Sequence, residues 1–167
     1  MRPFAVRVAI GALAGLLALP AAAQFPAAQP SLLPPDQAFH LSARALDPST
    51  LEVRFDIADG YYLYRDRLAF RVTPLSVGRV ELPPGKVKHD AFFGDVETYR
   101  REVVVRLPLT GAGQPGERVT LHADSQGCAD AGVCYPPNPQ QLQIVLPAAG
   151  APPGDYVEVA KPRGWFN

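Results

Sequence analysis

Cysteine is scarce in this chain: of its 167 residues, two are cysteine, one is methionine and one is tryptophan. Two thiols are too few for a disulfide-stapled miniature fold or for a four-cysteine zinc site, so both classes are excluded. An excess of charge of one sign is also missing, because 16 basic side chains balance 16 acidic ones. The chain has no basic field that could hold a phosphate backbone, so we expect no nucleic-acid partner.

Long apolar runs are limited to one, Val8–Leu19, which follows Arg2 and Arg7. As a helix these twelve residues span about 18 Å, short of the roughly 20 residues that a membrane crossing needs. The run ends in a proline and three alanines, which is typical of a secretory signal peptide cleaved after Ala23. A retained membrane anchor is the weaker alternative. We therefore predict a signal peptide over residues 1–23 and export to an oxidising compartment, where a disulfide persists.

After a Pro-rich linker predicted at 24–35, apolar and polar residues alternate in short runs. Leu51–Ile57 has apolar side chains at every second position, as a half-buried strand requires. Turn residues bound six further runs: Tyr61–Tyr64, Leu68–Val72, Val77–Leu82, Glu102–Leu107, Arg118–Ala123 and Gln141–Leu146. Seven or eight strands at spacings near ten residues predict an all-β fold, an immunoglobulin-like antiparallel β-sandwich over residues 36–147. We expect a frayed C-terminal tail at 148–167, which ends in the apolar pair Trp165-Phe166.

Both cysteines, Cys128 and Cys134, lie in one short segment between predicted strands. Gly127 and Gly132 let the backbone turn there, which predicts a hairpin or loop that brings the sulfurs together. By chain entropy, so small a ring stabilises by about 2.4 kcal/mol, against about 4.7 kcal/mol for a hundred-residue loop, which weakens the case for a purely structural disulfide. Five intervening residues, however, are not the familiar two-residue redox spacing, which favours a structural one. Spacing alone slightly favours a structural disulfide and leaves a redox-active pair open.

Residues 126–137 closely resemble the active-site segment of the N-terminal periplasmic domain of DsbD, the transmembrane thiol:disulfide interchange protein of Gram-negative bacteria. Further segments resemble the same family in the same order: 36–39, 59–65, and 89–94 with Glu97, Tyr99 and Arg100. The resemblance covers roughly Leu33 to Leu146. It departs from the family at Asp90-Ala91, where an acidic pair is common, so no role is assigned to a second carboxylate.

The resemblance implies an immunoglobulin-like domain with a redox-active cysteine pair that relays electrons as a thiol:disulfide oxidoreductase, without a cofactor. By position, Cys134 would form mixed disulfides with partners and Cys128 would resolve them. Six more residues would form a cap loop over the sulfurs or line the site: Asp90, Phe92, Phe93, Gly94, Tyr62 and Tyr64. The aromatic cap would shield the reduced pair from nonspecific oxidation, and Gly94 would let the loop hinge.

The resemblance also implies partners and a place in the cell. Expected partners are thioredoxin-like periplasmic proteins of the disulfide-isomerase or cytochrome c maturation type. Because no membrane channel or thioredoxin-like domain follows the predicted sandwich, we expect the electron donor to be a membrane thiol transporter on a separate chain. A truncated reading frame of a longer protein would give the same sequence as a stand-alone domain. We expect the domain to be a periplasmic monomer, with a Cys134 thiol that is not strongly acidified because Asp124 and Asp130 are its near neighbours.

The same residues allow other interpretations. Tyr62 and Tyr64 fit an ordinary strand, and adjacent aromatics such as Phe92-Phe93 fit docking into a core as well as binding. The rival function is an immunoglobulin-like binding module with an inert disulfide and a partner-binding aromatic loop. A third is a copper or zinc carrier that uses both cysteines and His122, but no fourth ligand is evident and we predict no metal site. No nucleophile elbow, phosphate loop or zinc-protease motif is present.

Overall fold

The computed structural model describes residues 31–90, 93–111 and 113–159, which form antiparallel sheets and two short helical turns. The helical turns are α1 (Pro35–Ala38) and the 3-10 turn η1 (Arg65–Arg67). The strands follow in chain order: β1 (Phe39–Asp47), β2 (Thr50–Ile57), β3 (Tyr61–Tyr64), β4 (Ala69–Thr73), β5 (Ser76–Val77), β6 (Lys86–Asp90), β7 (Gly94–Tyr99), β8 (Glu102–Thr110), β9 (Arg118–Ser125), β10 (Gly127–Ala129), β11 (Asn138–Val145) and β12 (Val157–Glu158). The predicted signal peptide and residues 24–30 of the predicted linker lie outside the described residues.

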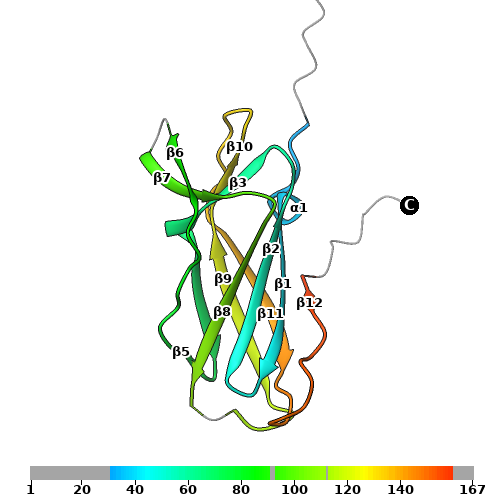
Figure 1. The fold of residues 1–167 in the computed structure, drawn as a ribbon. Coiled ribbons are helices and arrows are strands. Elements are labelled where there is room, and N and C mark those ends of the chain that lie inside the picture. The colour runs from blue at the N-terminus through cyan, green and yellow to red at the C-terminus, as the bar shows by residue number, and fades with distance from the viewer. Residues whose placement is uncertain (1–30, 91–92, 112, 160–167) are drawn as a thin grey trace, which may run out of the picture.

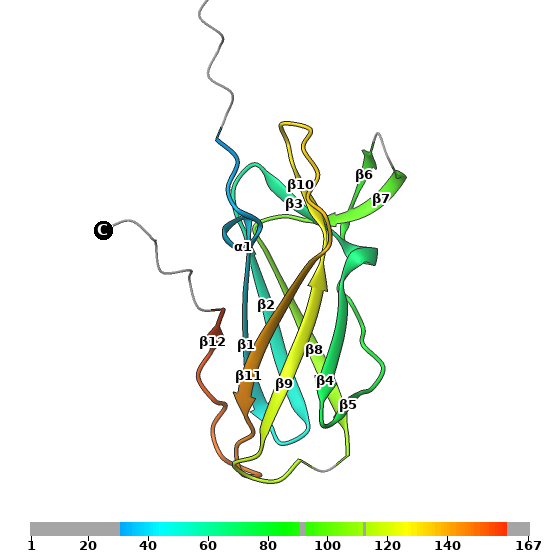
Figure 2. The same cartoon turned by 180° about the vertical axis from the view of Figure 1, so that it is seen from behind.

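Two sheets form the body of the sandwich (Figures 1 and 2). One has the strand order β12-β1-β2-β8-β5, the other the order β11-β9-β4, and they pack face to face along the long axis of the molecule. The predicted all-β immunoglobulin-like sandwich is confirmed. Within the described residues, no helix is long and apolar enough to cross a membrane.

Alternation of apolar residues explains the core between these sheets. In β8 every second residue from Val103 to Leu109 is buried while its neighbours are exposed. Phe55 on β2 and Leu121 on β9 are each 0% exposed and reach the core from opposite sheets. Burial of one such side chain stabilises the fold by about 1.5–3 kcal/mol, so the period of two fixes which face of each strand turns inward.

A third sheet lies at one end of the sandwich and carries both cysteines. Its strand order is β10-β3-β7-β6, and its hairpins project from the same end of the molecule (Figure 1). This sheet adjoins the sandwich because a short turn at Gly60, whose φ is +82°, joins β2 of the sandwich to β3. The chain thus brings residues near positions 62, 90 and 128 into one small sheet.

The structure differs from the predicted strands in one segment and adds others. Val77–Leu82 was expected to be a strand, but ladder pairing with β8 ends at Val77, after which the Gly78 amide donates to the Pro108 carbonyl. Among the described residues, no strand pairs with residues 79–82, and the prolines that follow at 83 and 84 cannot donate to a ladder. β1 was not predicted from the alternation of apolar residues, because alanines occupy two of its inward positions and alanine is a weak strand former. The short strands β6, β7 and β10 were also not anticipated.

The C-terminal segment was expected to fray, but part of it belongs to the sheet. β12 pairs antiparallel with β1, and the Gly154 amide donates a hydrogen bond of 2.9 Å to the Ala45 carbonyl. The Tyr156 hydroxyl donates to Glu52 at 2.8 Å. These bonds hold residues 154–158 against the edge of the sandwich. Residues 160–167, with the predicted apolar pair Trp165-Phe166, lie outside the described residues.

Candidate redox site

The cysteine pair sits on a hairpin built from β10 and the chain that returns after it. β10 pairs with β3 so that Cys128 lies opposite Tyr62. The chain then turns and returns, which places Cys134 in a bridge with Cys128. Gly132 has a φ of +84° in the turn, a conformation that favours glycine. The predicted hairpin with a cysteine pair is confirmed.

The two sulfurs are bonded to each other, and their surroundings differ. The S–S distance is 2.11 Å and the Cα atoms are 3.9 Å apart. Cys128 is 0% exposed, whereas Cys134 is half-buried and lines a cavity of about 180 Å³ together with Tyr62, Lys88 and Asp90. Cys134 is therefore the more exposed cysteine of the pair.

Gly127 has a different role from the expected one. Sequence analysis assigned it to the turn, but it lies in β10, and its φ is not positive. A Cβ at this position would lie 2.2 Å from the Tyr62 carbonyl oxygen and 2.6 Å from Cζ of Phe39. Glycine is therefore required because the hairpin approaches β3 and the core this closely, and Cys128 follows it in β10, where it is paired with Tyr62.

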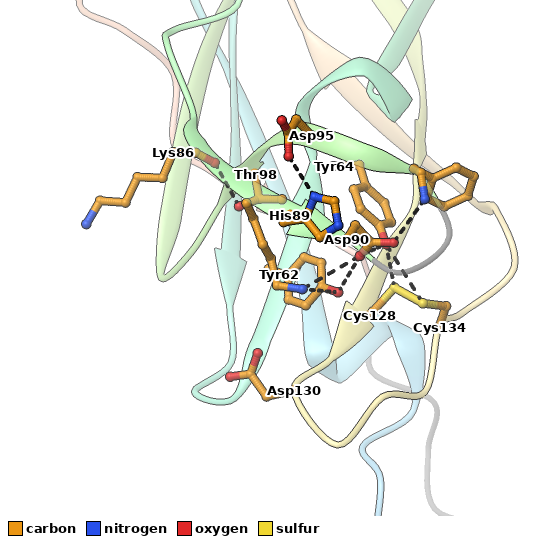
Figure 3. A network of polar contacts seen from close by, with 12 residues as sticks. Tyr62, Tyr64, Lys86, His89, Asp90, Asp95, Thr98, Cys128, Asp130 and Cys134 are labelled. Atoms are coloured by element: carbon orange, nitrogen blue, oxygen red, sulfur yellow. Dashed lines mark hydrogen bonds and ion pairs between the residues drawn. A yellow bond between two sulfur atoms is a disulfide. The ribbon is translucent and has the colours of Figure 1, made fainter.

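A buried polar network lies beside the disulfide (Figure 3). The Tyr64 hydroxyl lies 2.8 Å from Oδ2 of Asp90 and 3.1 Å from the Cys128 sulfur, while the Cys134 sulfur is 3.9 Å away. The Tyr62 hydroxyl donates to the same Asp90 oxygen at 3.0 Å. Burial, followed by the bond to Asp90, raises the pKa of Tyr64 far above its usual value. The Tyr64 hydroxyl therefore keeps its proton at neutral pH.

Cations lie on the outer side of this network. Lys88 Nζ donates to the Tyr62 hydroxyl at 3.1 Å and is 3.6 Å from Asp90. The Tyr62 bond and the Asp90 charge together raise the pKa of Lys88. The guanidinium of Arg100 lies 5.1 Å from the centre of the Tyr62 ring. Sequence analysis did not assign a role to either cation. Lys88 could have been found because it alternates with Asp90 on one face of β6.

Phe93 and Gly94, two residues of the predicted cap loop, lie where the β6–β7 hairpin returns into β7. Phe93 packs edge-on against Tyr64 with ring centres 5.2 Å apart, and its amide donates to Oδ1 of Asp90 at 3.3 Å. Its side chain is 43% exposed. Gly94 has a φ of +71°, which suits the tight return into β7. Phe92 lies outside the described residues.

The end of the predicted linker is attached beside this site. The Leu33 amide donates to the Tyr61 hydroxyl at 2.8 Å, and the Tyr135 hydroxyl donates to the Leu33 carbonyl at 2.7 Å. Burial, followed by the interaction with Tyr61, raises the pKa of Tyr135 to about 12.

Within the described ranges, no three histidine, cysteine, aspartate or glutamate side chains gather as a metal site requires.

Comparisons with known proteins agree with this geometry. The family model for the N-terminal part of thiol:disulfide interchange protein DsbD matches residues 29–146. The DsbD protein of Ralstonia nicotianae is 49% identical over 86% of this chain, and DsbD 1 of Pseudomonas aeruginosa is 46% identical over 65% of it. The chain covers 23% and 18% of the lengths of these relatives, respectively.

Two solved structures from Neisseria meningitidis are also similar. The reduced DsbD N-terminal domain superposes with a TM-score of 0.65 at 34% identity, over 77% of this chain and 96% of that one. The complex between the DsbD and PilB N-terminal domains contains a chain that superposes with a TM-score of 0.59 at 37% identity, over 72% and 93%. The resemblance found in the motifs is thereby confirmed, and the chain belongs to the family of the DsbD N-terminal domain.

Proposed function

We propose that this protein is a periplasmic thiol:disulfide interchange protein that passes electrons to the disulfides of partner proteins. One observation carries the proposal: a half-buried Cys134 is bonded to a fully buried Cys128, whose sulfur meets the Tyr64 hydroxyl. An inert staple needs no such difference between its two sulfurs. Exchange needs one sulfur that a partner can reach and a second that is kept close behind it.

In the first step the reduced protein attacks its partner. The Cys134 thiolate attacks one sulfur of the partner disulfide, the partner's S–S bond breaks, and the other partner sulfur leaves as a thiolate. A mixed disulfide now joins Cys134 to the partner. Because Cys134 lines the open cavity, this bond forms at the surface of the domain.

In the second step the Cys128 thiolate attacks the Cys134 sulfur, so the mixed disulfide breaks and the partner leaves as a dithiol. The protein ends with its own disulfide and has given up two electrons. The Cys128 thiol first gives up its proton to solvent, and the partner thiolates take up protons from solvent as they leave. The Tyr64 oxygen is positioned to accept a hydrogen bond from the Cys128 thiol, and Asp90 holds the Tyr64 hydroxyl in place.

Phe93 and the chain beside it would control access to the pair. Phe93 covers Tyr64, and the guanidinium of Arg67 lies 5.0 Å from the centre of its ring. The loop returns through Gly94, and the Phe93 amide donates a hydrogen bond to the Asp90 carboxylate. Such a segment can shield the reduced sulfurs and move aside when a partner docks.

Partners of the thioredoxin-like class, in disulfide isomerisation or cytochrome c maturation, fit this proposal. The Neisseria complex supports it, since a related N-terminal domain forms a complex with another protein domain there. We also propose that a membrane thiol transporter on a separate chain supplies the electrons. The exchange requires no cofactor.

Mixed-disulfide trapping tests the proposal. The purified Cys128→Ser variant is reduced and mixed with an oxidised thioredoxin-like protein, and the matched control is Cys134→Ser. We expect a stable covalent adduct with Cys128→Ser and little or none with Cys134→Ser, by mass spectrometry. Equal adduct formation by both variants would contradict the roles of the two cysteines. Absence of adducts from both would favour the binding-module alternative.

A further inference from the structure

Arg100 makes four separate contacts at the point where the cysteine hairpin meets the sheet. Its Nη1 and Nη2 atoms donate to the two carboxylate oxygens of Asp130 at 2.9 and 2.6 Å. Nη1 also lies 3.4 Å from the Tyr61 carbonyl, and the guanidinium stacks on the Tyr62 ring. Arg100 follows β7, whereas Asp130 is in the hairpin turn, so the contact joins segments that are far apart in sequence.

Asp130 is the point at which the turn is fastened to the rest of the domain. Its amide donates to the Gly60 carbonyl at 2.7 Å, and its carboxylate holds Arg100. The Arg100 hydrogen bonds lower the pKa of Asp130, so the pair is ionised at neutral pH. Two-point pairing of guanidinium and carboxylate fixes direction as well as distance. The turn is therefore held by both its backbone and its side chain.

The arm that carries Cys134 depends on these attachments. Its backbone pairs with the first arm of the hairpin, through Ala129 with Val133 and through Tyr135 with Gly127. In the oxidised protein the disulfide adds a covalent tie between the arms. In the mixed disulfide that tie is gone, because Cys134 is bonded to the partner. The fastening of the turn then has a larger share in keeping Cys134 near Cys128.

We propose that Arg100 is a positioning residue for the exchange reaction. Through Asp130 it holds the turn of the cysteine hairpin, so that the mixed disulfide on Cys134 stays within reach of Cys128. This inference rests on the proposed function and adds a residue that acts on its second step. Intramolecular attack depends steeply on the position of the reacting atoms, so a looser turn slows it.

Glutathione disulfide separates the two steps. The reduced protein first attacks it through Cys134, which forms a protein–glutathione mixed disulfide and releases one glutathione. Cys128 then attacks the Cys134 sulfur, which closes the protein disulfide and releases the second glutathione. Two electrons pass from the protein to glutathione disulfide. Acid quenching and mass spectrometry of the intact protein give the amounts of all three protein species over time.

The variants are Arg100→Gln, Asp130→Asn and the two combined. We expect the mixed disulfide to accumulate in each because its resolution slows about tenfold, about 1.4 kcal/mol in the barrier. We expect its formation to stay within about twofold of wild type. The combined variant is expected to be no slower than the single ones, because both remove the same contact.

Arg54→Gln is the matched control. Arg54 pairs with Asp56 and Glu102 in the five-stranded sheet, and its side chain is 38% exposed against 40% for Arg100. Arg100→Lys keeps the charge without the two-point geometry and is expected to be intermediate. These variants show whether loss of a surface ion pair is enough to cause the effect.

The outcomes are distinct. An unchanged rate of mixed-disulfide resolution in both Arg100→Gln and Asp130→Asn would overturn the positioning role of the Arg100–Asp130 pair. Equal slowing of mixed-disulfide formation and resolution, or additive effects in the combined variant, would also overturn it. The same slowing in Arg54→Gln would also overturn it. If the reduced wild-type protein never closes its disulfide in glutathione disulfide, the proposed function is overturned, and the positioning role of Arg100 with it.

Discussion

The Tyr64 hydroxyl lies 3.1 Å from the sulfur of Cys128, the fully buried member of the disulfide. The same hydroxyl is held by Asp90, whose side chain is 3% exposed. A hydroxyl and a carboxylate therefore lie beside the disulfide, where an inert disulfide would need only apolar packing. The proposed reactivity of the cysteines would thus depend on the electrostatics of the small sheet.

Asp90→Asn is expected to make the reduced cysteines more reactive. The buried carboxylate opposes a second negative charge on the nearby sulfurs, and an amide in its place does not. We expect alkylation of Cys134 by iodoacetamide at pH 7 to speed up, by up to about tenfold if the effect equals one pKa unit. Asp124→Asn is the control, because Asp124 is close in sequence but lies exposed on β9. An unchanged or slower rate in Asp90→Asn would contradict this account.

The raised pKa of Tyr64 predicts a loss of stability at alkaline pH. Tyr64 ionises at about pH 10 in the unfolded chain but only at higher pH in the folded one, so the unfolded state loses its proton first. Its contribution is complete below about pH 10 and falls above it, by up to about 1.4 kcal/mol per pH unit. Urea unfolding between pH 8 and 11 measures the slope. Tyr64→Phe is expected to flatten it, and an identical slope in the variant would refute the assignment.

Two glycines of the hairpin are expected to respond differently to the same substitution. Gly132→Asn is expected to cost less than about 1 kcal/mol, because asparagine tolerates positive φ and no atom lies within 4 Å of the added Cβ. Gly127→Asn is expected to destabilise by about 1–3 kcal/mol or to prevent folding, because its Cβ meets backbone at 2.2 Å. Thermal unfolding compares them, and equal losses would show that Gly127 is not a site of close approach.

Tyr156→Phe tests the attachment of the C-terminal segment. The lost hydrogen bond to Glu52 is expected to cost about 1–2 kcal/mol, because Glu52 is a nearly buried carboxylate. Hydrogen exchange at the Gly154 amide is expected to accelerate with it, since that amide is bonded to β1. If exchange there equals that of a free peptide already in the wild type, the segment is not part of the sheet.

Local patterns were sufficient for the sandwich and for the cysteine hairpin. The strands around Phe55 and Leu121 alternate clearly because one of their faces is buried, and the segment from Gln126 to Pro137 carries a motif that is specific to its family. The prediction for Val77–Leu82 was wrong because alternation alone does not show whether a partner strand lies alongside. Strand pairing depends on the tertiary structure, which is why most of Val77–Leu82 is not a strand.

The cations of the site, Lys88 and Arg100, also show that tertiary contacts cannot be predicted from local sequence patterns. Lys88 alternates with Asp90 in the sequence, but no local pattern indicates that Lys88 and Arg100 both lie against the ring of Tyr62. They reach it because β6, β7 and β3 pair side by side in the small sheet, which depends on the whole fold. Sequence analysis placed Asp90, Asp124 and Asp130 near the cysteines but assigned no lysine or arginine to the site. The structure adds Lys88 and shows that the charge of Asp130 is met by Arg100.

The reduction potential of the Cys128–Cys134 pair tests the central proposal most directly. The purified protein is equilibrated with mixtures of reduced and oxidised glutathione, free thiols are alkylated, and the mass shift reports the oxidised fraction, with Cys128→Ser as the control that cannot close the bond. The account predicts a midpoint of about −180 to −270 mV, within reach of thioredoxin-family couples. A bond that stays oxidised well below about −300 mV would identify a structural staple and contradict the electron relay.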